Sequence, residues 1–119
     1  MRQIRIALAE LASELHHLVK QALADQPDIV LVVVVSNEVT LLLEAERVDV
    51  VIVAMRGNKL PAVAERLVDE YPRLGVVCVD AEAGGGVVYR LRPSLAAMDE
   101  VSPRAIAAAI RSAAEDTTR

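Results

Sequence analysis

The stretch Val48-Asp-Val-Val-Ile-Val53 decides the fold, because it is a short and almost uninterrupted run of β-branched residues. Two similar runs lie elsewhere in the chain, at Ile29–Val35 and Val76–Val79, and a more alternating run spans Ile4–Leu8. Short apolar runs of this kind are typical of strands that are buried on both faces, as in a parallel sheet. The sequence therefore predicts four strands of one buried sheet.

Segments with helical periodicity separate the predicted strands. Before the second strand, apolar residues recur at the three- and four-residue spacing of an amphipathic helix. They are Leu11, Leu15, Leu18, Val19, Ala22 and Leu23. A third helix follows Pro61, and a last helix begins at Ser102-Pro103, where serine can cap the helix and proline suits its first turn.

A short helix is predicted over about residues 38–46, with Ser36 or Asn37 as its cap. Its apolar residues Val39, Leu42 and Leu43 are expected to face inward. The alternation of strands and helices predicts an α/β fold with a mainly parallel sheet between two helical layers, a three-layer αβα sandwich. We expect a single domain over residues 1–115 and a frayed C-terminal tail over residues 116–119.

The segment after the fourth strand breaks this alternation. Only Ala81-Glu-Ala-Gly-Gly-Gly86 lies between Asp80 and the apolar residues 87–91. A parallel crossover needs about a dozen residues, and three consecutive glycines indicate a turn. We therefore expect an antiparallel β-hairpin at one edge of the sheet, in place of a helix. The path of residues 87–101 stays open at this point.

Composition excludes several classes of partner. The 119 residues carry a formal net charge of −4, and the chain has no Trp or Phe and only two Tyr. Binding to a phosphate backbone or to stacked bases requires cationic and aromatic surfaces, so no nucleic-acid partner is expected. The longest apolar run, Ile29–Val35, is too short to span a bilayer, and no signal peptide is visible. With one cysteine, Cys78, the sequence predicts a cytoplasmic protein with no membrane partner.

The order and spacing of several segments resemble a response-regulator receiver domain. The matching segments are Arg2-Gln-Ile-Arg-Ile-Ala-Leu8, Leu23-Ala-Asp-Gln-Pro-Asp-Ile29, Arg47-Val-Asp-Val-Val-Ile-Val53, Glu70-Tyr-Pro-Arg-Leu74 and Glu100-Val-Ser-Pro-Arg-Ala-Ile106. The resemblance implies a flavodoxin-like fold, in which the hairpin replaces the fourth helix of a receiver.

The same resemblance implies that the phosphorylation chemistry is lost. The acidic pair of a receiver aligns with Glu10 and Leu11, and the phosphoacceptor aspartate aligns with Ala54. The hydroxyl position falls near Asp80, and the lysine position falls on Arg92 or, with a different threading, on Asp99. A methyl group cannot attack a phosphoryl donor, so we expect a pseudo-receiver that is not phosphorylated at Ala54.

Several other side chains could take part in binding. Glu10, Asp80 and Glu82 could hold a divalent cation, or they could be solvated loop carboxylates, which we favour. Arg56-Gly-Asn-Lys59 could cradle an anion, or it could be a plain connecting loop, which we also favour. The adjacent His16 and His17 point in different directions on a helix and cannot chelate one ion. We predict no catalytic residue, no metal and no cofactor.

The C-terminal part of the chain carries the predicted interface. Val87, Tyr89 and Leu91 form the outer strand of the hairpin, and Ile106 and Ile110 form a stripe on the last helix. We expect these residues to mediate a homodimer or contact with an unidentified protein partner. The predicted function is a regulatory protein-interaction module and not an enzyme. Two alternatives remain: a small-molecule sensor or enzyme that uses Glu10, Arg56 and Asp80, and a structural assembly component.

Overall fold

Six strands and four α-helices form the fold in the computed structural model, which describes residues 3–9, 11–57, 59, 61–80, 84–90 and 94–114, with backbone only at 90 and 94–96. The strands are β1 (Ile4–Ala9), β2 (Ile29–Val35), β3 (Val50–Ala54), β4 (Gly75–Asp80), β5 (Gly85–Arg90) and β6 (Ser94–Met98). The helices are α1 (Ser13–Ala24), α2 (Glu38–Glu44), α3 (Ala62–Glu70) and α4 (Pro103–Ala114), with a short 3₁₀ turn at Ala45–Arg47.

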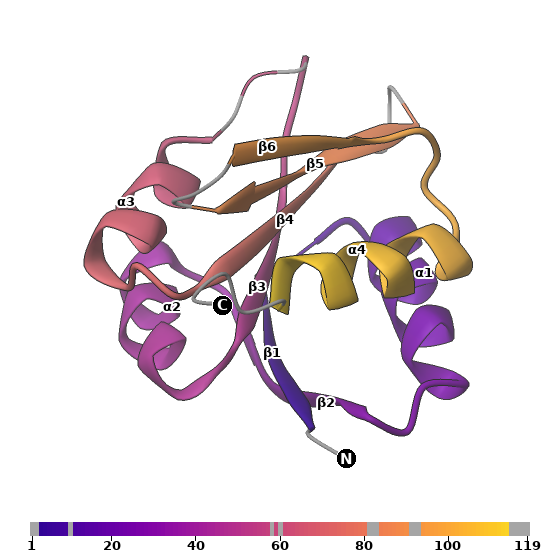
Figure 1. The fold of residues 1–119 in the computed structure, drawn as a ribbon, viewed down its shortest axis with the longest axis horizontal. Coiled ribbons are helices and arrows are strands. Elements are labelled where there is room, and N and C mark those ends of the chain that lie inside the picture. The colour runs from indigo at the N-terminus through magenta and orange to yellow at the C-terminus, as the bar shows by residue number, and fades with distance from the viewer. Residues whose placement is uncertain are drawn as a thin grey trace.

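The strands form one mixed sheet in the order β2-β1-β3-β4-β5-β6. Strands β2, β1, β3 and β4 pair with one another in parallel. The pairs β4–β5 and β5–β6 are antiparallel. Figure 1 shows α1 and α4 on one side of this sheet and α2 and α3 on the other. The predicted α/β class, the parallel strands and the antiparallel hairpin are confirmed.

Alternate residues of the central strands supply two apolar cores. The first core lies between the sheet and α1 with α4, and the second lies between the sheet and α2 with α3. In β3, Val50 and Ile52 enter the first core while Val51 and Val53 enter the second. This two-sided burial explains why the strand sequences are almost continuously apolar. Each fully buried Val or Ile side chain contributes roughly 1.5–3 kcal/mol.

Helix α2 turns a different face to the core than the sequence predicted. Leu41 is 3% exposed and Ala45 is 2% exposed, whereas Val39 and Leu43 are each 68% exposed. The inward assignment of Val39 and Leu43 is therefore wrong, while Leu42 is half-buried against the second core. The cause is geometric, because residues two positions from Leu41 lie about 200° around the helix axis. Burying Leu41 and Ala45 forces both side chains outward.

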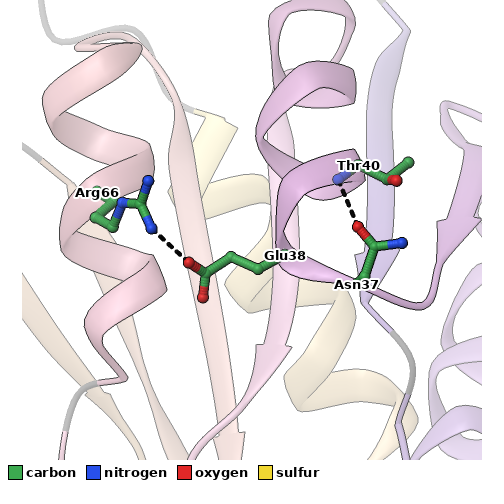
Figure 2. A network of polar contacts seen from close by, with 4 residues as sticks. All are labelled: Asn37, Glu38, Thr40 and Arg66. Atoms are coloured by element: carbon green, nitrogen blue, oxygen red, sulfur yellow. Dashed lines mark hydrogen bonds and ion pairs between the residues drawn. The ribbon is translucent and has the colours of Figure 1, made fainter.

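Polar contacts fix α2 at its N-terminus and join it to α3 (Figure 2). The side-chain oxygen of Asn37 accepts a hydrogen bond from the backbone N–H of Thr40 at 2.8 Å, which confirms Asn37 as the helix cap. Arg66 on α3 donates to Glu38 on α2 at 2.5 Å. Both of these side chains are largely exposed, so the ion pair contributes at most about 1 kcal/mol. The position of α2 therefore depends mainly on its buried apolar residues.

The antiparallel part of the sheet has one strand more than predicted, because β6 pairs with β5. Val88 of β5 pairs with Ala96 of β6, and Gly86 pairs with Met98. Strand β5 is therefore an inner strand, and the prediction that it forms the sheet edge is wrong. The sequence Ser94-Leu-Ala-Ala-Met98 is poor in β-branched residues, so its strand conformation comes from pairing with β5 and not from local propensity.

The two leucines of α2 give a matched test of this fold. We expect Leu41→Ala to lower the free energy of unfolding by about 2–5 kcal/mol, since it leaves a cavity in the second core. Leu43→Ala removes the same atoms from an exposed site and should change stability by no more than about 0.5 kcal/mol. Urea unfolding followed by circular dichroism measures both values. Equal losses for the two variants would contradict the described orientation of α2.

Candidate functional site

The carboxyl ends of β1, β3 and β4 lie along one edge of the sheet, where open α/β sheets bind their ligands. Strand β3 ends at Ala54, which is exposed although the adjacent Val53 and Met55 are buried in the second core. Ala54 pairs with Val79, so Asp80 lies one residue further along β4. A methyl group offers no lone pair to a phosphoryl donor. The central strand therefore ends without a nucleophile at Ala54.

The residues aligned with a phosphorylation pocket do not gather into one site in the described part of the chain. Leu11 is 9% exposed and belongs to the first core. Glu10 and Arg92 lie outside the described residues. Only Ala54 and Asp80 are seen at the strand ends, on neighbouring strands.

Asp80 is the one buried polar or charged residue among those described, with 2% of its surface exposed. It ends β4, where its backbone carbonyl accepts a hydrogen bond from Gly84 N–H at 2.9 Å and opens the turn into β5. Strand alternation places its side chain on the same face as Val76 and Cys78, the face covered by α3. Asp80 is therefore not an open crevice residue, contrary to the crevice expected around Glu10, Arg56 and Asp80.

The loop after β3 presents two cations to solvent. Arg56 and Lys59 are both exposed and pair across an isolated antiparallel bridge, in which Lys59 N–H donates to the Arg56 carbonyl at 3.0 Å. Gly57 has a positive φ of 59°, which allows this tight turn without the strain of a side chain. The sequence predicted the cationic residues, but not that they would be directly opposed.

Metal-binding side chains do not cluster in the part of the chain that the structure describes. Across the described ranges, no three His, Cys, Asp or Glu side chains are arranged to hold a metal ion. Glu10 and Glu82, predicted as possible ligands with Asp80, fall outside those ranges. His17 lies exposed on α1, and its Nε2 is 3.2 Å from the amide nitrogen of Gln21 one turn later. That contact ties His17 to its own helix.

Strands β5 and β6, called the hairpin from here on, have one covered face and one open face. Val88 is 4% exposed and lies in the first core beneath α4, the only described helix that packs extensively on β5. Val87 and Tyr89 lie on the other face and are half-buried at the margin of the second core. Ala97 of β6 pairs with Val87, so it lies on that same face, where it is exposed. We call Val87, Tyr89 and Ala97 the open face.

The predicted interface needs correction at α4. Ile106 and Ile110 are 0% exposed and belong to the first core, so neither can contact a partner while the domain is folded. Their helical spacing follows the buried stripe of α4, not a surface stripe. Leu91, the remaining predicted interface residue, lies outside the described residues.

Exposed apolar residues that the sequence did not predict lie on β2, the other edge strand of the sheet, and on α2. Val34 on β2 is 46% exposed, in addition to Val39 and Leu43 on α2. No sequence pattern identifies Val34 as exposed, because a valine within an apolar strand is expected in the core. Finally, none of the described helices combines the length and apolar character needed to cross a membrane.

Comparison with known proteins gives no relative. No family model matches the chain, and neither curated proteins nor solved structures match it at a significant level.

Cys78 gives a test of the sheet interior. The thiol is 0% exposed, and burial raises its pKa from 9.0 to about 12. At pH 8 the native thiol is therefore protonated and shielded, so alkylation by iodoacetamide should be on the order of a hundredfold or more slower than in the unfolded chain. Mass spectrometry of timed reactions with and without guanidinium chloride gives the two rates. Comparable rates would contradict a buried central β4.

Proposed function

We propose that the chain is a receiver-like regulatory domain that acts by non-covalent binding to a protein and not by accepting a phosphoryl group. The observation that carries this proposal is Ala54 at the end of the central strand β3, where a receiver has its phosphoacceptor. The strand order 2-1-3-4 is shared with flavodoxin-like folds, which supports the receiver-like assignment. The antiparallel β5 and β6 stand where such a fold continues with a helix and a parallel strand.

The missing helix gives the proposed binding surface. In the described residues, no helix follows β4 before α4, so the open face has only the edge of the second core behind it. Val87, Tyr89 and Ala97 give this face an apolar and aromatic character, which suits a protein partner. Neither a bound metal nor a cofactor is part of the proposal.

A second copy of the chain is the partner that we favour. Strand β6 is last in the sheet order, so one side of its backbone faces no strand of its own sheet. An antiparallel strand pair between two copies is self-complementary around a twofold axis. The other sheet edge, β2, is less suited to pairing because its register with β1 shifts between Ile6 and Ala7, and such irregularities disrupt edge pairing. A cytoplasmic homodimer is therefore the proposed working form.

Phosphoryl transfer to Ala54 is tested directly by intact mass. We expect incubation with acetyl phosphate and Mg²⁺ to add no phosphoryl group, because no carboxylate stands at the end of β3. An intact receiver treated in the same way is the positive control. A stoichiometric gain of one phosphoryl group that survives at neutral pH and is released by hydroxylamine would contradict the proposal.

The proposed dimer is tested with two matched alanines. Ala97 is exposed on the open face, and Ala108 is exposed on α4. We expect the wild type and Ala108→Asp to be dimers by light scattering after size exclusion. Ala97→Asp should be a folded monomer, with a dimer affinity at least about tenfold weaker, because it puts a charge on β6, the strand proposed to pair with the second copy. A wild type that is monomeric at all concentrations, or equal effects of both variants, would refute dimerisation through the open face.

A further inference from the structure

The turn after β3 holds two positive charges in an unfavourable arrangement. Arg56 and Lys59 are partners in an antiparallel bridge, so their side chains lie on the same face with Cβ atoms about 4.5–5.5 Å apart. Like charges that are directly opposite destabilise such a pair. The conformation of Gly57 sets this opposition, since its positive φ closes the turn.

Among the described residues, no acidic side chain forms an ion pair with either of these charges. The ion pairs among those residues join Arg5 to Asp49, Arg47 to Glu44, Arg66 to Glu38 and Arg111 to Asp28. Neither Arg56 nor Lys59 takes part in them. What distinguishes these two cations from other exposed ones, such as Arg73 and Arg104, is that the bridge holds them directly opposite each other on one turn.

The position of the turn favours a ligand. It follows the carboxyl end of β3, the edge at which open α/β sheets bind ligands. Extended backbone alternates, so Arg56 lies on the same face as the exposed Ala54, and Met55 between them is buried in the second core. Asp80 lies on the opposite face of the sheet, beneath α3, so its carboxylate does not occupy the space beside Ala54.

We propose that Arg56 and Lys59 form a non-covalent binding site for a phosphate-class oxyanion. The planar guanidinium can bind two oxygens of a tetrahedral anion, and the ammonium can bind a third as a point charge. Ala54 is exposed and supplies no competing carboxylate. No bond to phosphorus forms or breaks, so binding at this site differs from covalent phosphorylation. The proposed site also does not depend on the proposed dimer.

The test uses the full chain and inorganic phosphate, titrated at constant ionic strength and followed by amide NMR shifts. We expect saturable shifts in residues 53–59 of the wild type. Arg56→Gln with Lys59→Gln should weaken binding by at least about tenfold, because it removes two charge-assisted contacts. Lys20→Gln with Arg104→Gln removes one exposed lysine and one exposed arginine from α1 and α4, and it should bind like the wild type.

Two sources of the phosphate group are separated by a parallel titration with O-phosphoserine. Equal affinity for the two ligands indicates a free or small-molecule phosphate, and tighter binding of O-phosphoserine indicates a phosphorylated side chain. Either result supports the site if the Arg56→Gln and Lys59→Gln variant loses it. Shifts that do not saturate, that spread over other cations, or that persist in a variant with a wild-type circular dichroism spectrum would overturn the proposal.

Discussion

Burial of the central strands on both faces is the constraint on which the rest of this structure depends. In β3 and β4 every second side chain enters the first core and the others enter the second core, with hardly any exposed surface until the strands end. Such strands need helices on both sides, which α1 with α4 and α2 with α3 provide. Gly75 shows how close this packing is, because a Cβ at that position would lie 2.1 Å from the carbonyl oxygen of Ala113 in α4. The burial ends only where the strands emerge, as at the exposed Ala54.

The short turn after β4 has the largest consequence for function. Because the connection from Asp80 to Gly85 is too short for a crossover, β5 must return antiparallel, and β6 follows it. The chain thereby continues the sheet with two antiparallel strands, whose one face packs on α4 and whose other face stays open. At the carboxyl ends of the parallel strands, β3 ends at Ala54, which carries no nucleophile, and the Arg56–Lys59 turn carries two positive charges. These features support the proposed reversible binding and offer no group for phosphoryl transfer at Ala54.

Sequence patterns predicted those features that depend on local periodicity or chain length. The apolar runs became β1–β4, Asn37 and Ser102 cap their helices, and the glycine-rich turn forms the hairpin. The orientation of α2 was not predictable, since Leu41, Leu42 and Leu43 are identical residues and only packing selects Leu41 for the core. Strand β6 has alanine-rich sequence and depends on its partner β5. The opposition of Arg56 and Lys59 depends on the backbone of Gly57, which the sequence does not reveal. The buried Ile106 and Ile110 show that an apolar stripe on a helix predicts core residues better than interface residues.

We propose that β1, β3 and β4 form a buried sheet interior and that the domain binds its protein partner through β5 and β6. Amide hydrogen exchange of the wild type at low and high protein concentration tests it most directly, because it reports on the sheet and on the binding surface together. We predict that β1, β3 and β4 exchange slowest and equally at both concentrations, and that β5 and β6 gain protection only at high concentration. Fast exchange in β4, or added protection at β2 and α2 in place of the hairpin, would contradict the account.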